Sequence, residues 1–450
     1  MKRIEIFLII IIIVGGILFL CCKNNILNNN LKVKEKNTLE KKEDNLINNC
    51  IVIDNLAMTK IECQDNVIYD LDLENSYQIG DIITIKYREE LKKENIIHIE
   101  KDNRFNYIED KGIFSNYYED ALKLLKNMTI DKKIGQILLA RVADINQIKD
   151  LKTYKFGGYL LFKRDFTNKT KAEVIKMIKS YQENSSIPLL IAADEEGGSV
   201  SRISSNKNLV SNPFKSPRTL YLEGGLDKIK EDTIEKNKVL ERLGINLNLA
   251  PVVDVSTNES DYMYKRSLGE DEKITSEFAK TIIQASKDSK VSYTLKHFPG
   301  YGNNSDTHIG LSVDTRELDE IKNIDLLPFK AGIEEGAEAI LVSHNIVSSI
   351  DSNNPASISI KVHNLLRNDL EFTGVIITDD LSMGAINDYY KEGAVVNAIN
   401  SGNDLLIVTD YKNSIKEIKN AINDKVLSEN IINKRVLRIL AWKYYKGLIK

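Results

Sequence analysis

The strongest constraint that this chain places on its fold is a repeated alternation of short apolar segments with longer amphipathic ones, which begins at about residue 117. The short segments have the length and the β-branched content of buried strands, and the longer ones carry apolar residues at helical spacing. The predicted strands are 158–162, 189–193, 246–250, 291–295, 339–342, 375–378 and 405–408. The predicted helices include 130–139, 171–182, 235–243, 277–287 and 436–445. Repeated strand–helix units favour a parallel sheet, and the length of the pattern favours a (β/α)8 TIM-type barrel of the α/β class over an open sheet.

Polar residues cluster directly after three of the predicted strands. A run from Asp194 to Arg202 follows the strand at 189–193, and Asp379-Asp380 follows the strand at 375–378. A third run, from Lys296 to His308, follows the strand at 291–295 and is predicted to be a loop. A single acidic residue after a strand is commonly a helix cap. Several clusters at strand carboxyl ends would meet at one rim of a barrel, so we predict an active site at this rim.

Composition limits the class of protein. The 450 residues are 42% hydrophobic and 28% charged, which is enough to bury a large core and to form more than one domain. The net charge of -3 gives no global basic field, so we expect no nucleic acid partner.

An uncharged apolar run at residues 6–22 follows Lys2 and Arg3. Its length is about the minimum for one membrane-spanning helix, and its basic flank predicts that the rest of the chain lies outside the cytoplasm. We favour an uncleaved anchor in the cell membrane over residues 1–22. A cleaved signal peptide, or lipidation at Cys21 or Cys22, is the alternative, and each also makes the catalytic domain extracytoplasmic.

Two further segments precede the barrel, which we expect to occupy residues 117–450. Residues 23–49 are rich in Asn, Lys and Glu, which is typical of a disordered polar linker. Residues 50–110 alternate apolar and polar residues in short runs and predict a small β-rich module, which either binds cell-wall polymer or spaces the barrel from the membrane. Cys50 and Cys63 of this module could form a disulfide or remain free thiols.

The barrel segment offers no cofactor signature. No cysteine follows Gly112, which excludes thiol catalysis and a cysteine-ligated metal there. No nucleotide-binding glycine loop and no metal-ligand spacing is present, so we expect neither a cofactor nor a metal.

The barrel segment carries an ordered series of motifs. They are the predicted helix at 130–139, GGYLLF, the D-x-E-G-G-x-V-x-R run at Asp194 to Arg202, NLAPVVDV, Lys265-Arg266-Ser267, KHFPG followed by D-T-H, Ser343-His344 and TDDLSMGA. Together, over residues 128–446, they resemble the family 3 glycoside hydrolases. Among these, the series is similar to the bacterial β-N-acetylglucosaminidases, or β-hexosaminidases, that act on peptidoglycan fragments.

This resemblance implies a retaining hydrolase that removes β-linked N-acetylglucosamine from a glycan or muropeptide. Asp379 matches the family nucleophile, His308 matches the acid/base, and Asp306 matches the carboxylate that orients His308. An imidazole with a pKa near neutrality can donate a proton to the leaving oxygen and later take one from water. A carboxylate on its other nitrogen orients the ring and supports the imidazolium form.

The resemblance also implies the residues that hold the sugar. They are Asp194, Arg202, Arg266, Lys296 and His297. The two arginines have an alternative role, since each could instead brace a carboxylate such as Asp194 or Glu196. We expect His344 in the pocket wall only.

Three positions depart from the family pattern. Tyr301 stands where His is common, Ser199 stands where Arg is common, and the turn before Asp306 is one residue shorter than usual. Within the enzyme class the alternatives are a β-glucosidase, a xylosidase and a glycoside phosphorylase. Outside it, the alternative is a membrane-tethered protein that binds the cell wall through an inactive barrel.

Overall fold

The computed structural model describes residues 44–73, 77–102, 104–109, 111–302, 312–383, 386 and 393–450. The described residues divide into two compact units, of which the larger lies within 47–84 and 100–450 and the smaller contains 44–46 and 85–99. Within the smaller unit, Asp44 forms ion pairs with Lys86 and Arg88, at 2.8 and 3.0 Å. Of the helices in the described residues, none is both long and apolar enough to cross a membrane. The anchor predicted at residues 1–22 lies outside the described residues.

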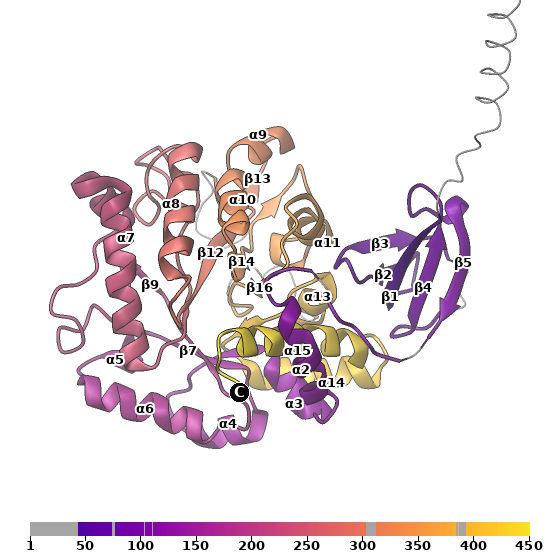
Figure 1. Ribbon diagram of the computed structural model, residues 1–450, viewed down its shortest axis with the longest axis horizontal. Helices are drawn as coiled ribbons and strands as arrows, with labels where there is room; N and C mark the ends of the chain where they lie inside the picture. Colours follow the sequence, from indigo (N-terminus) through magenta and orange to yellow (C-terminus); the bar gives the residue numbers. More distant parts are fainter. Residues whose placement is uncertain are drawn as a thin grey trace, which may run out of the picture. The chain divides into compact units, whose positions relative to one another are not determined.

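The predicted α/β barrel is confirmed as a nearly closed parallel sheet of eight strands, with helices outside the strands (Figure 1). The strands are β6 (Leu138–Arg141), β7 (Gly158–Leu161), β8 (Leu190–Ala193), β11 (Leu247–Asn248), β12 (Ser292–Phe298), β14 (Ala339–Val342), β16 (Val375–Thr378) and β17 (Leu406–Val408). Their order in the sheet is β16-β14-β12-β11-β8-β7-β6-β17. A parallel bridge between Ile377 and Leu405 links the two outer strands and brings the sheet close to closure.

Helices cover the outer face of this sheet, which is why its strands are buried on both faces. The helices that follow the strands include α4 (Gln147–Tyr154), α6 (Lys171–Glu183), α7 (Pro217–Leu243), α8 (Glu272–Ser286), α10 (Leu326–Glu334), α11 (Ile360–Asn364), α13 (Ala394–Ser401), α14 (Tyr411–Asn423) and α15 (Glu429–Tyr445). The local sequence fixes where several of these helices begin. Thr170 and Glu173 form a capping box at α6, and the Asp271 side chain accepts the first free N–H groups of α8.

Several predicted boundaries differ from the structure, and two of the differences bear on the site. The helix predicted at 130–139 is α3 (Ile130–Gln136) followed by strand β6, whose Leu139 pairs with Gly158 of β7. The strand predicted at 291–295 is β12, which continues through Lys296 and His297 to Phe298, so these two residues are not in a loop. In both cases sheet pairing outweighs the local pattern. In β12 the buried Lys296 ammonium is neutralised by the Asp194 and Glu196 carboxylates, which follow β8, so a charged residue does not end the strand.

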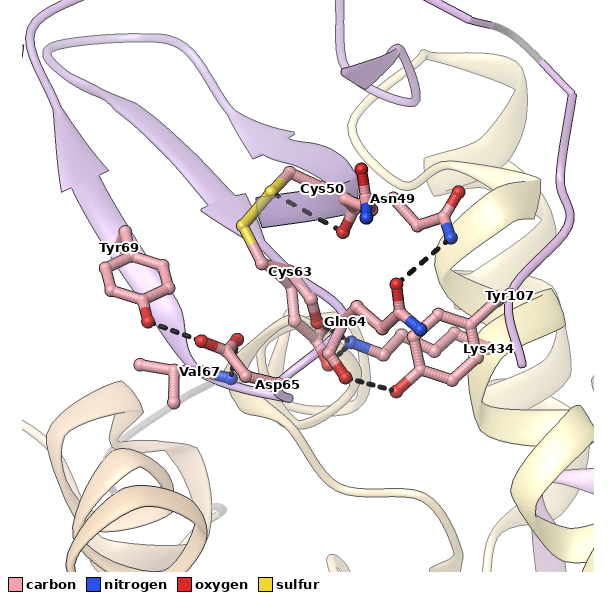
Figure 2. The surroundings of a disulfide bond; sticks show 11 residues. Asn49, Cys50, Cys63, Gln64, Asp65, Val67, Tyr69, Tyr107 and Lys434 are labelled. Carbon is pink, nitrogen blue, oxygen red and sulfur yellow. Dashed lines mark hydrogen bonds and ion pairs between the residues drawn. A yellow bond between two sulfur atoms is a disulfide. The ribbon is translucent and has the colours of Figure 1, made fainter. Parts of the chain in front are cut away.

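The segment predicted as a β-rich module contains five strands in one sheet, in the order β3-β2-β1-β4-β5. They are β1 (Asn45–Asp54), β2 (Thr59–Glu62), β3 (Ile68–Leu71), β4 (Ile82–Tyr87) and β5 (Ile96–Lys101). Strand β1 begins within residues 23–49, which were predicted to be linker. It runs antiparallel to β2, with Ile51 opposite Glu62, which brings Cys50 opposite Cys63. These two cysteines form a disulfide (Figure 2).

The chain around this disulfide is bound to the last helix of the barrel. Figure 2 shows the Lys434 side chain of α15 reaching the Cys63 carbonyl, to which its ammonium donates at 2.7 Å. The same ammonium lies 4.7 Å from the centroid of the Tyr107 ring, and the Tyr107 hydroxyl donates to the Gln64 carbonyl at 3.1 Å. Polar and cation–π contacts therefore join β1–β3 to α15.

Helix α15 carries several charged side chains into the interior. Arg435 donates to both carboxylate oxygens of Glu62 on β2, and Lys434 lies 2.9 Å from the same carboxylate. Burial alone would raise the pKa of Glu62, but these two cations lower it. Further along the helix, Arg438 pairs with Asp404, which lies two residues before the last barrel strand, β17. The helix thus links the sheet of β1–β3 to the barrel through paired buried charges.

We predict that Arg435→Met lowers the free energy of unfolding by about 3–5 kcal/mol, because removing one partner of a buried ion pair leaves the other poorly compensated. Urea denaturation followed by circular dichroism measures this change. Lys123→Met, which removes an exposed pair with Asp120, serves as the control and should change stability by no more than about 0.5 kcal/mol. Equal effects of the two substitutions would contradict the structural role of Arg435.

Candidate active site

The predicted site residues that the structure describes meet at one cavity. It has a volume of about 330 Å³ and lies at the carboxyl ends of the barrel strands. This volume lies within the usual range of about 300–1,000 Å³ for small-molecule sites. The predicted residues that line the cavity are Asp194, Arg202, Arg266, Lys296, His297 and Asp379.

Lys296 lies at the centre of the charged network of this cavity. Its ammonium is 2.9 Å from the Oδ1 atom of Asp194 and 2.7 Å from the Oε1 atom of Glu196. Only 4% of the Lys296 side chain is exposed. Burial by itself would lower the pKa of Lys296, but the two carboxylates raise it. Lys296 therefore remains a cation that fixes both carboxylates.

Glu196 links this lysine to Arg266. The Arg266 guanidinium donates from Nη2 to Oε1 at 2.7 Å and from Nε to Oε2 at 3.0 Å, which is a two-point pairing. Burial raises the pKa of Glu196, but Lys296 and Arg266 outweigh that effect and lower it to about 2. Glu196 was not among the predicted sugar-binding residues, although it had been considered as a carboxylate that the arginines could brace.

Arg202 has a looser environment. Its Nη2 atom lies 3.3 Å from the Oδ2 atom of Asp194, and its guanidinium lies 5.4 Å from the centroid of the Phe162 ring. Arg141 lies over the same ring at 4.3 Å and also lines the cavity. The sequence did not reveal Arg141, because the helix predicted at 130–139 covers the first two residues of β6, so that strand was not recognised. Both predicted arginines brace a carboxylate, and both still face the cavity.

His297 is held by a carboxylate that the sequence analysis did not single out. Its Nδ1 atom is 2.8 Å from the Oδ2 atom of Asp254, and its backbone N–H donates to the same oxygen at 3.3 Å. The Nε2 atom lies 3.4 Å from Nη2 of Arg266. Since a carboxylate can only accept, Nδ1 donates to Asp254, and Nε2 faces the Arg266 guanidinium. The Lys296–His297 peptide bond is cis.

Asp379 begins a tight turn after β16. Its backbone N–H donates to the Val342 carbonyl at 3.0 Å, and its Oδ1 atom accepts from the backbone N–H of Asp380 at 2.8 Å. The Asp380 carboxylate accepts from the Thr409 hydroxyl at 2.5 Å and from the Ser382 backbone N–H at 2.9 Å. Strand β14 and the chain after β17 thus fix the turn that presents Asp379 to the cavity.

His344, expected in the pocket wall, lies behind this turn instead. Its Nε2 atom donates to the Asp380 carbonyl at 3.0 Å, and its Nδ1 atom accepts from the Ser357 hydroxyl at 2.7 Å. It is fully buried and is not among the residues that line the cavity. Its contact with the site runs through the backbone of the Asp379 turn.

Asp306 and His308, the predicted acid/base pair, lie outside the described residues. The structure describes the chain on both sides of them, up to Gly302 and again from Ser312. Among the described residues, no group of three or more His, Cys, Asp or Glu side chains is arranged to hold a metal ion.

The family is decided by a match of residues 129–442 to the model of the glycosyl hydrolase family 3 N terminal domain. The chain belongs to glycosyl hydrolase family 3. Curated relatives agree with this. A beta-hexosaminidase of Xylella fastidiosa (strain M23) is 32% identical over 258 residues, which is 56% of this chain and 76% of that protein. Beta-hexosaminidase LpqI of Mycobacterium tuberculosis is 29% identical over 327 residues, which is 69% of this chain and 82% of that protein.

Solved structures extend this comparison of the family 3 chain. A glycoside hydrolase family 3 beta-N-acetylglucosaminidase from Paenibacillus sp. str. FPU-7 superposes with a TM-score of 0.67 at 28% identity. That match covers 71% of this chain and 63% of the Paenibacillus chain. LpqI of M. tuberculosis superposes with a TM-score of 0.65 at 27% identity and covers 71% and 95% of the two chains. The resemblance to the bacterial β-hexosaminidase type of family 3 is therefore confirmed.

The lowered pKa of Glu196 predicts a pH-dependent contribution to the stability of this family 3 protein. Because the folded pKa is about 2 and the ordinary value is 4.5, the contribution is complete above pH 4.5 and is lost as the pH falls toward 2. Its full size is on the order of 3 kcal/mol. Urea denaturation of wild type and Glu196→Gln between pH 6 and pH 3 should show the stability advantage of wild type shrinking with acidity.

The control for this experiment is Glu277→Gln, which changes an exposed carboxylate paired with Lys280. Its stability difference from wild type should stay within about 0.5 kcal/mol over the same pH range. A difference between wild type and Glu196→Gln that does not vary with pH would contradict the ion-pair assignment.

Proposed function

We propose that this chain is a retaining β-N-acetylhexosaminidase that releases β-linked N-acetylglucosamine from peptidoglycan-derived or related glycans. One observation carries the proposal: Asp379, at the end of β16, lines the same cavity as the charged network of Asp194, Arg266 and Lys296. The relatives named beta-hexosaminidase and beta-N-acetylglucosaminidase support the choice of sugar.

The charges that line the cavity suit an uncharged, hydroxyl-rich ligand. Four basic residues, Arg141, Arg202, Arg266 and Lys296, lie beside four acidic ones, Asp194, Glu196, Asp379 and Asp380. The formal charges cancel, while donors and acceptors remain on every side of the cavity. Hydroxyl groups both donate and accept, so a sugar ring can exploit such a mixture with directional hydrogen bonds.

In the first step of the proposed reaction, the Asp379 carboxylate attacks the anomeric carbon of the bound sugar. The bond to the leaving oxygen breaks, and His308 gives that oxygen a proton. Asp306 orients the His308 ring and stabilises the imidazolium form that donates this proton. This step leaves the sugar covalently bound to Asp379. Asp194, Arg202, Arg266, Lys296 and His297 hold the ring through its hydroxyl and N-acetyl groups.

In the second step, His308 takes a proton from water, and the water oxygen attacks the anomeric carbon. The bond to Asp379 breaks, which releases the sugar with its original anomeric configuration and regenerates both residues. A preorganised turn is useful here, because the nucleophile must stay aligned with the anomeric carbon through both steps. Two hydrogen bonds hold the Asp379 turn in this way. The Asp379 carboxylate accepts from the Asp380 N–H, and the Asp379 N–H donates to the Val342 carbonyl.

We predict that the fragment from about residue 32 hydrolyses a chromogenic N-acetyl-β-glucosaminide faster than the matching β-glucoside. Asp379→Ala removes the nucleophile, so kcat/KM should fall by on the order of 100-fold or more. His308→Ala removes the base of the second step, so kcat should fall by on the order of 100-fold, while kcat/KM falls less because the chromogenic leaving group needs little protonation. Steady-state kinetics measure both preferences and losses. Thr153→Ala, on the exposed face of α4, serves as the matched control.

Each other outcome selects an alternative. Activity on the β-glucoside alone would keep the assignment to family 3 and change the proposed substrate to a β-glucoside. Faster turnover with added phosphate, with a sugar phosphate as product, would indicate a phosphorylase. A folded fragment that turns over neither substrate but binds cell-wall polymer would favour the non-catalytic alternative.

We further propose that residues 1–22 hold the protein in the cell membrane with the barrel outside the cytoplasm. The uncharged run at 6–22 and its basic flank support this. The full chain should appear in the membrane fraction, resist alkaline washing and be digested by external protease, whereas a variant lacking residues 1–22 should be soluble. A soluble product whose mass lacks the first residues would instead indicate a cleaved signal peptide.

A further inference from the structure

The chain that leads into residues 303–311 is fixed at the barrel rim. The Tyr301 backbone N–H donates to Oδ1 of Asp254 at 2.8 Å, which is the carboxylate that also holds His297. The Gly300 carbonyl accepts from the Asn345 side chain at 3.3 Å, and the Gly300 N–H donates to the His297 carbonyl at 2.9 Å. The path of the chain up to Gly302 is therefore set by buried hydrogen bonds.

The chain that leaves residues 303–311 is fixed as well. Strand β13 (Val313–Asp314) pairs in parallel with β15 (Ile346–Val347). The Ser312 carbonyl accepts from the Ile346 N–H at 2.8 Å, and the Asp314 carbonyl accepts from the Ser348 N–H at 2.9 Å. The described chain on either side of residues 303–311 is thus anchored by hydrogen bonds.

One guanidinium binds carboxylates beside both of these anchored stretches. Arg316 Nε donates to Oδ1 of Asp314 at 3.1 Å, and Nη2 donates to its Oδ2 atom at 2.7 Å. On its other side, Arg316 Nη1 donates to Oδ2 of Asp325 at 2.7 Å. The side chains of Asp314 and Asp325 are 2% and 0% exposed, and that of Arg316 is 18% exposed. Such two-sided pairing is specific to the planar fork of arginine.

The same ion cluster packs against the first anchored stretch. A side chain at Gly302 would collide with the Arg316 guanidinium, and one at Gly300 would collide with the Asp325 carboxylate. Both glycines also have positive φ values, of 56° and 128°. Arg316 therefore touches the chain that enters residues 303–311 and binds Asp314 in the chain that leaves them.

We infer that Arg316 is a positioning residue for catalysis, which holds together the two ends of the segment that carries Asp306 and His308. The inference rests on the proposed function, in which His308 is the acid/base. Fixing both ends of a short segment restricts the places its side chains can reach. Proton transfer is sensitive to such placement, because the donor must come within hydrogen-bond reach of the leaving oxygen.

The charges around Arg316 also favour a cation at this position. Burial raises the pKa of Asp325 to about 6, even though Arg316 lowers it, and the carboxylates of Asp254 and Asp314 add to the rise. Two buried carboxylates, of Asp314 and Asp325, thus bind one guanidinium, and the Glu320 carboxylate lies 3.9 Å from it at its exposed edge. Without Arg316 the carboxylates would repel one another at the base of the segment.

The test compares two aryl N-acetyl-β-glucosaminides, one with a readily departing nitrophenol and one with a poorly departing methoxyphenol. A good leaving group needs little protonation, so a misplaced acid slows the methoxyphenyl substrate more. For Arg316→Met we expect kcat/KM to fall at least about tenfold more on the methoxyphenyl than on the nitrophenyl substrate, the same direction of dependence as in His308→Ala. A general loss of structure would slow both substrates by the same factor.

Arg218→Met is the matched control, since Arg218 also lies at the rim, where it donates to the Gly269 carbonyl at 3.0 Å and stacks on Tyr264. It should change the two substrates equally. If His308→Ala shows the leaving-group dependence and Arg316→Met does not, the inference is wrong while the proposed function stands. If wild type turns over neither substrate, or His308→Ala shows no such dependence, the proposed function fails and the inference falls with it. Should Arg316→Met not fold, Arg316→Lys keeps the charge without the fork and decides by the same criterion.

Discussion

The buried ammonium of Lys296 is the constraint around which the rim of the barrel is organised. It lies on β12, inside a parallel sheet, where an unpaired charge would cost several kcal/mol. It is neutralised by Asp194 and Glu196, which follow β8, and Glu196 in turn binds Arg266. Because each carboxylate is shared between two cations, the side chains that face the cavity fix one another. The sugar site proposed for this rim therefore exists before any ligand binds, which reduces the ordering that binding must impose.

The same principle recurs on the outside of the barrel, where α15 meets β1–β3. Glu62 is shared by Lys434 and Arg435, as Glu196 is shared by Lys296 and Arg266. Buried ion pairs are weak evidence for added stability, but their geometry permits few alternative partners. The charges on α15 therefore specify where the β1–β3 strands attach, while apolar contacts supply most of the driving force. Near the rim, Arg316 fixes two carboxylates by the same kind of sharing.

Sequence patterns predicted the parts of this molecule whose burial is uniform. The strands at 339–342 and 375–378 were located to the residue, because they are apolar runs buried on both faces. The cavity residues Asp194, Lys296 and Asp379 were found because polar side chains stand directly after or at the end of such strands. Arg141 was missed, since the turn of helix before β6 continues the apolar spacing into the strand. Asp254 belongs to the NLAPVVDV motif but was given no role, because nothing in the sequence connects it to His297 until the fold brings the two together.

The balanced charge of the cavity has a consequence for how a ligand arrives there. With four acidic and four basic side chains around it, the cavity has little net electrostatic field beyond a few ångströms, because the opposite charges largely cancel. Screening by salt then has little left to act on. Association with a neutral glycan is then limited by diffusion and orientation, and not by electrostatic steering. The rate at which such a cavity takes up an uncharged sugar is therefore expected to change little between dilute and concentrated salt.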